Sequence, residues 1–140
     1  MGNSDTHLEG QIGIPHTVVF AEELTTEAIL SGIRGGRSWV AESADVDVTF
    51  TAHADGRVAR VGEQLTTLGG RVQVRAAVRG VPVGSVSFHT GGEGYRASLL
   101  GDGADVVQWD TTAEESMFVR IEVRHPNGDV AALTNPIILV

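Results

Sequence analysis

The hydrophobic pattern of this chain changes near residue 43, and that change constrains the fold more than any other feature. From Val46 onward apolar and polar residues alternate, as in "VDVTFTAH" (46–53) and "RVQVRAAVR" (71–79). Alternate residues of an extended strand point to opposite faces of a sheet, so each segment has one apolar and one polar face. The pattern predicts β-strands for the second part of the chain.

Turn-forming sequences divide this part of the chain at intervals of about 8–12 residues, the spacing typical of β-sandwiches. Asn127-Gly128 is the strongest of them and predicts a tight hairpin between the last two strands. Further strands are expected at 83–90, 94–100, 104–110, 116–125 and 130–140, and a turn at 100–105. We therefore predict a mainly β fold, in which residues 44–140 form an immunoglobulin-like β-sandwich of about seven strands.

The sandwich has no disulfide to support it, because the chain contains no cysteine. Its core must depend on packing alone. Phe50, Phe88 and Trp109 are the aromatic residues expected in that core, together with the valines of the alternating segments.

Residues 1–43 have a different pattern, that of one strand followed by one helix. "TVVFA" (17–21) is a short apolar run rich in β-branched residues, and 26–34 has helical spacing. Thr25 is a suitable N-cap, and Leu24 is placed to pack against Ile29. Gly35-Gly36 follows and predicts the helix end. Such a strand-helix unit is the building block of parallel sheets and β/α barrels.

Charge and composition exclude some partners. The chain has 18 acidic and 10 basic residues, a net charge of −8, and every basic residue is arginine. Nucleic-acid binding needs clustered cations to neutralise phosphates, so we expect no nucleic-acid partner. We expect no membrane partner either, because no apolar stretch approaches the roughly 18 residues of a membrane span. The sequence leaves the cellular location open, with the cytoplasm slightly favoured because no leader pattern precedes the first strand.

The segment "GNSDTH" (2–7) is the one candidate metal motif. Asp5 and His7 are two residues apart, so on an extended backbone the carboxylate and the imidazole project the same way and can share one divalent ion. His16, at the start of the predicted strand, is a further candidate. Spacing alone is a weak signal, and a catalytic metal site needs at least three protein ligands.

The other polar residues favour structural roles. His53, His89 and His125 lie at polar ends of predicted strands, where we expect solvated side chains. Arg71, Arg75 and Arg79 share the polar face of one predicted strand and could bind an anion, but in a net acidic protein such arginines more often pair with neighbouring carboxylates.

The order of these signals resembles the C-terminal end of the PHP (polymerase and histidinol phosphatase) superfamily, in its carbaryl-hydrolase-like branch of metallohydrolases. The resemblance rests on "GNSDTHLEGQIGIPHTVV", on "TTEAILSGIRGGRSWVAES", and on a sandwich that opens with "VDVTFTA" and closes with "AALTNPIILV". It implies that residues 1–43 are the last strand and helix of a β/α barrel and that residues 44–140 are an appended sandwich.

The resemblance also implies a chemistry. In this family a cluster of divalent metal ions (Zn, Mn or Fe) polarises an ester and supplies hydroxide, and the last ligand motif has the form G-[SN]-D-x-H. Carried over, Asp5 and His7 are metal ligands. The other ligand motifs of the family have no counterpart here, so the chain is expected to be an inactive C-terminal fragment of a phosphoesterase or hydrolase, with no metal bound on its own.

The missing barrel has a consequence for association. Apolar residues of the strand-helix unit would face absent neighbours, so residues 8–40 are expected to fold back on the sandwich, to pack against the missing barrel, or to pair with a second chain as a homo-oligomer. Two alternatives stay open. One is a stand-alone β-sandwich interaction module that dimerises through its N-terminal segment, and the other is a metalloenzyme assembled across a homo-oligomer.

Overall fold

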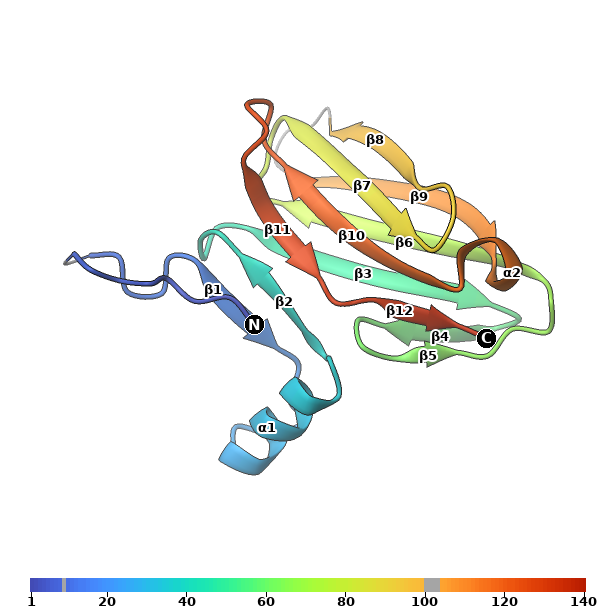
Figure 1. The fold of residues 1–140 in the computed structure, drawn as a ribbon, viewed down its shortest axis with the longest axis horizontal. Helices are drawn as coiled ribbons and strands as arrows, with labels where there is room; N and C mark the ends of the chain where they lie inside the picture. The colour runs from blue at the N-terminus through green and yellow to red at the C-terminus, as the bar shows by residue number, and fades with distance from the viewer. Residues whose placement is uncertain (9, 100–103) are drawn as a thin grey trace.

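The computed structural model describes residues 1–8, 10–99 and 104–140, which form a mainly β sandwich of two sheets (Figure 1). The predicted fold class is confirmed. In Figure 1 the two sheets lie one behind the other, and the strand-helix unit extends from one side of the sandwich.

The larger sheet has eight strands in the described part of the chain. Its order is β1-β2-β11-β10-β12-β5, and β7 and then β8 continue the sheet from the other side of β10. The strands are β1 (His16–Val19), β2 (Ser38–Ala41), β5 (Gln64–Leu65), β7 (Gly84–Thr90), β8 (Tyr95–Leu99), β10 (Phe118–Arg124), β11 (Val130–Thr134) and β12 (Ile137–Leu139).

Within residues 1–8, 10–99 and 104–140, the smaller sheet has four strands, all antiparallel to their neighbours, in the order β4-β3-β6-β9. They are β3 (Asp47–Ala54), β4 (Arg57–Arg60), β6 (Arg71–Arg79) and β9 (Ala104–Thr112). A short helix, α2 (Ala113–Ser116), follows β9 and leads into β10.

The core lies between the two sheets and is formed by the apolar residues of the alternating segments. In β6 every second residue from Val72 to Val78 is buried, as the alternation predicts. Phe50 and Phe88 are 2% and 1% exposed, and Trp109 packs against them from a partly buried position. The three predicted aromatic core residues are therefore confirmed.

The helix of the N-terminal unit begins and ends where the sequence predicts. α1 spans Thr26–Arg34, and the Thr25 hydroxyl accepts a hydrogen bond from the Ala28 amide, which satisfies one of the free donors of the first turn. Gly36 has a φ of +69°, the left-handed conformation expected after a helix. The predicted packing of Leu24 on Ile29 is wrong, because the Leu24 side chain is 94% exposed.

The N-terminal unit is joined to the sandwich by a strand that the sequence pattern does not indicate. β2 pairs with β1 on one side and with β11 on the other, so the β1–β2 hairpin extends the larger sheet. Residues 38–41 lie within the predicted unit 1–43, yet they hydrogen-bond to the unit 44–140. Part of the segment 8–40 therefore folds back on the sandwich.

Smaller differences concern chain breaks. β4 and β5 are short strands that the sequence pattern did not predict. The predicted strand 130–140 is divided into β11 and β12 at Asn135-Pro136, because proline has no amide to donate to a ladder. The predicted strand 94–100 is β8, and Leu100 lies outside the described residues, as do the first four positions of the turn predicted at 100–105.

Candidate functional site

The N-terminal loop that carries the candidate metal ligands is anchored to the outer side of β1 and β2. The Gly2 amide donates to the Thr17 hydroxyl at 3.0 Å, and that hydroxyl donates to the Gly2 carbonyl at 2.7 Å. A Cβ added at Gly2 would lie 2.9 Å from Val40, so a glycine is needed for this close approach. The loop therefore has a fixed attachment three residues before Asp5.

Within the loop, Asp5 has a φ of +44°, so the backbone is not extended there as the predicted ligand pair assumed. Backbone contacts nevertheless fix both residues. The Asp5 amide donates to the Asn3 side-chain oxygen at 2.9 Å, and the His7 Nδ1 lies 2.6 Å from the Asp5 carbonyl oxygen. Both side chains are exposed. Among the described residues, the Asp5 carboxylate and the His7 Nε2 make no hydrogen bond or ion pair, so both remain available as ligands.

These residues fit part of a metal site and not a complete one. A catalytic metal site uses at least three protein ligands, and residues 1–8, 10–99 and 104–140 contain no group of three or more histidine or acidic side chains that could hold an ion. His16 lies on β1, and its Nδ1 is 2.9 Å from the Gly13 carbonyl oxygen. The structure does not bring His16 together with Asp5 and His7.

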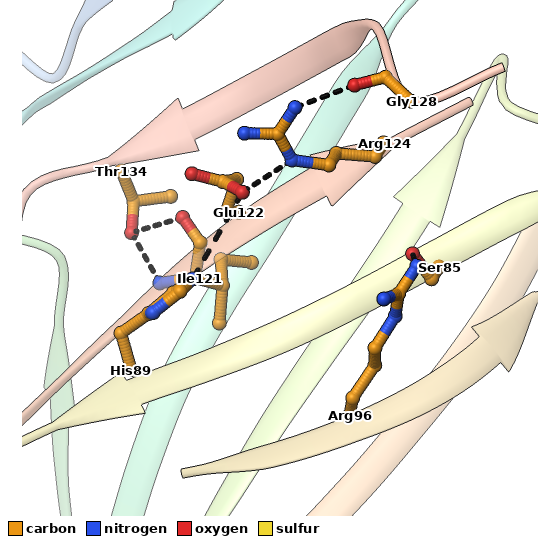
Figure 2. Close-up of polar contacts among 8 residues, drawn as sticks. All are labelled: Ser85, His89, Arg96, Ile121, Glu122, Arg124, Gly128 and Thr134. Carbon is orange, nitrogen blue, oxygen red and sulfur yellow. Dashed lines mark hydrogen bonds and ion pairs between the residues drawn. The ribbon is translucent and has the colours of Figure 1, made fainter. Parts of the chain in front are cut away.

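A second polar cluster lies on the larger sheet and is centred on Glu122 of β10 (Figure 2). The Arg124 Nε donates to the Glu122 carboxylate at 2.5 Å, and the His89 Nε2 lies 4.0 Å from the same oxygen. The hydrogen bond from Arg124 is the main cause that holds the pKa of Glu122 below its usual value, while burial acts in the opposite direction. Glu122 and Arg124 are two residues apart on β10, whereas His89 is brought to them by the pairing of β7 with β10, which the sequence pattern did not indicate.

Removing the charge of Glu122 is expected to reduce stability in a pH-dependent way. In the variant Glu122→Gln we expect the free energy of unfolding at pH 7 to fall by about 1.5 kcal/mol, the low end for a hydrogen bond to a charged group. Because the folded-state pKa of Glu122 is lowered, its contribution is present above the unfolded-state pKa of about 4.3 and is lost as the pH falls through the folded-state pKa. Urea unfolding of both proteins at pH 7 and at acid pH measures this difference.

The control for that measurement is Glu22→Gln, the same substitution at an exposed residue of the loop before α1. It should change stability by less than about 0.5 kcal/mol at either pH. A difference between wild type and Glu122→Gln that stays constant from pH 7 to about pH 3 would contradict the assigned role of the ionised carboxylate.

Several of the remaining polar residues have structural partners. Arg71 pairs with Asp110 and Arg79 with Asp47, each at 2.5 Å, as predicted, whereas Arg75 forms no ion pair among the described residues. His53, His89 and His125 were expected to be solvated, but all three are partly buried. The His53 Nε2 lies 2.9 Å from the Thr51 hydroxyl, and the His125 Nε2 lies 2.5 Å from a Glu42 oxygen. The contact of His125 joins the loop after β2 to the β10–β11 turn, two regions far apart in the sequence.

Comparison with known proteins adds no relative. No family model, no curated protein and no solved structure matches the chain. Among the described residues, no helix is long and apolar enough to cross a membrane.

Proposed function

We propose that this chain is the C-terminal portion of a PHP-family metal-dependent hydrolase, in which Asp5 and His7 supply two ligands to a divalent metal centre. The observation that carries the proposal is the pair of free ligand atoms on one anchored loop, the Asp5 carboxylate and the His7 Nε2. Two ligands leave such a centre incomplete, so other parts of the protein would supply the rest.

The exposed apolar surface of the strand-helix unit supports the proposal that this unit packs against another part of the protein. Six apolar residues of this unit would be expected to face a packing partner. None of them is fully buried: Val18, Val19, Phe20, Ile29, Leu30 and Ile33. Phe20 is 52% exposed and Leu30 is 40% exposed, and Leu24 beside them is almost fully exposed. Figure 1 shows α1 extending beyond the ends of β1 and β2, away from the sandwich. Apolar surface of this kind is typical of an interface, here with the remainder of a β/α barrel.

On this proposal the 140-residue chain has no hydrolytic activity of its own, because two ligands cannot hold a catalytic metal cluster. The sandwich is then an accessory domain, attached to the metal-binding part through the β1–β2 hairpin.

A second candidate function is an interaction module that dimerises through its N-terminal segment. The observation in its favour is that, among the described residues, β1 ends the larger sheet and forms a ladder with β2 alone, while the N-terminal loop contacts it through the Thr17 side chain. Pairing of two β1 edges would extend the sheet across two chains.

The test of the proposed function is hydrolysis of bis(p-nitrophenyl) phosphate, with Mn²⁺ or Zn²⁺ added, by the product of the complete reading frame that contains these residues. We expect activity that falls at least about 100-fold in Asp5→Ala/His7→Ala, since metal-assisted hydrolysis depends on an intact ligand set. The control is His53→Ala, a histidine on the other sheet, which should leave activity unchanged. Activity that survives the double substitution would contradict the proposed role of Asp5 and His7.

A further inference from the structure

A cleft of about 350 Å³ opens between the two sheets beside β2 and β3. One wall is formed by the end of β1 and by β2, and the other by β3 and the residues that follow β4. The walls are mainly apolar and include Val18, Phe20, Trp39, Val48, Phe50 and Val61. This volume is within the range of small-molecule sites, roughly 300–1,000 Å³, and apolar walls with a few polar groups are their usual composition.

Two arginines bring positive charge to this apolar cleft. Arg37 and Arg60 both line it, and neither forms an ion pair among the described residues. Among the described residues, three of the ten arginines, Arg71, Arg79 and Arg124, pair with a carboxylate, so Arg37 and Arg60 share the unpaired state with most of the others. What distinguishes Arg37 and Arg60 is their position at a mainly apolar cleft, where two cations favour an anionic occupant.

The local contacts of these arginines engage only some of their donors: the Arg37 Nη2 donates to the Ser31 hydroxyl at 3.3 Å. The Arg37 Nε is buried without a hydrogen-bond partner, and a buried donor of this kind is normally satisfied in a native structure. The Arg60 guanidinium lies over the Phe20 ring, 5.6 Å from its centroid. Glu63 also lines the cleft, but its carboxylate accepts a hydrogen bond from the Arg60 backbone amide at 2.7 Å.

We propose that this cleft binds a small carboxylate that carries an aromatic or branched apolar body. The apolar body would contact Trp39 and Phe50, and the carboxylate would accept hydrogen bonds from the guanidinium groups of Arg37 and Arg60. Hydrogen bonds between two charged partners are about twice as strong as neutral ones, which explains why two arginines would be placed at an otherwise apolar site. The proposal goes beyond the hydrolase assignment, because neither Asp5 nor His7 lines the cleft. Val18 and Phe20 belong both to its wall and to the surface assigned above to a packing neighbour, so the site is proposed for the 140-residue chain, in which that surface is uncovered.

The test is a titration of the 140-residue chain with 4-phenylbutyrate and with its neutral analogue 4-phenylbutyramide, followed by ¹H–¹⁵N NMR. The chain has two tryptophans, and only Trp39 lines the cleft. We expect a saturable shift of the Trp39 indole signal, with the Trp109 indole as internal reference. The acid should bind at least about tenfold more tightly than the amide, since tenfold corresponds to about 1.4 kcal/mol.

Matched variants distinguish the contribution of the arginine charges to ligand binding from that of the shape of the cleft. Arg37→Gln and Arg60→Gln should each weaken 4-phenylbutyrate at least about threefold and leave the amide unchanged. Arg120→Gln removes the same charge from β10, away from the lining of the cleft, and should have no effect. Thr49→Trp, at an exposed residue of the lining, should block both ligands while the fold is retained. Equal affinity for acid and amide, equal shifts of both indoles, or the absence of saturable binding would each overturn the proposal.

Discussion

Replacement of Phe88 by alanine is expected to lower the free energy of unfolding by about 3–5 kcal/mol, the usual cost of removing a buried aromatic side chain. Phe88 is 1% exposed and lies on β7, which pairs with β10 in the larger sheet. Its ring is 6.2 Å from Phe50, 5.9 Å from Trp109 and 6.0 Å from Tyr95 by ring centroids, so it links both sheets. The loss is a large share of the 5–15 kcal/mol that stabilises a typical domain.

Urea unfolding followed by tryptophan fluorescence measures this effect, and Phe20→Ala is the matched control. Phe20 is the same residue type but is 52% exposed, so its replacement should cost less than about 1 kcal/mol. The dependence of unfolding on urea should be similar in all three proteins if the unfolded surface is unchanged. Equal losses for Phe88→Ala and Phe20→Ala would show that the core is not where the structure places it.

The second large effect is expected at Gly62, where the sandwich meets the end of α1. Gly62 has a φ of +81°, and an added Cβ would lie 2.4 Å from the carbonyl carbon of Gly36 and 2.6 Å from the amide nitrogen of Arg37. Its amide donates to the Pro136 carbonyl at 3.0 Å, which prevents a simple outward shift. For Gly62→Ala we expect a loss of about 2–5 kcal/mol, the sum of a left-handed backbone and an overpacked contact.

Gly56→Ala separates these two contributions. Gly56 has a similar φ of +74° in the β3–β4 turn, but an added Cβ there meets nothing within 4 Å. It should therefore show only the conformational cost, about 1–2 kcal/mol. Thermal and urea unfolding of both variants measure the difference. If Gly62→Ala is no more destabilised than Gly56→Ala, the close contact between residues 36 and 62 is not present in solution.

The parts of the fold that were predictable from the sequence are those specified by local chemistry. The alternation in 71–79 predicts a strand with one buried face because side chains alternate along any strand. Thr25 predicts the start of α1 because its hydroxyl can accept a first-turn amide. β2 was not predictable in this way, because "SWVA" is short and its strand conformation depends on pairing with β1 and β11.

The same distinction applies to the candidate sites. Asp5 and His7 are neighbours in sequence, so their spacing was enough to indicate a shared ligand pair. The cleft was not predictable, because its lining comes from four separated segments, 18–20, 37–39, 48–51 and 60–63. Leu24 shows the opposite case, in which a local sequence pattern gave a wrong prediction. Its local spacing favours packing on Ile29, but the side chain is left exposed.

The most direct test of the account is the metal content of the protein together with its mass in solution. Elemental analysis would be performed on fractions from a sizing column with light scattering. The samples are the 140-residue chain, the product of the complete reading frame, and that product with Asp5→Ala/His7→Ala. We expect stoichiometric divalent metal only in the complete product, and its loss in the double variant, because two ligands do not make a full site. Metal content in the complete product that is unaffected by the double substitution would contradict the central claim, and a metal-free dimer of the 140-residue chain would favour the interaction module instead.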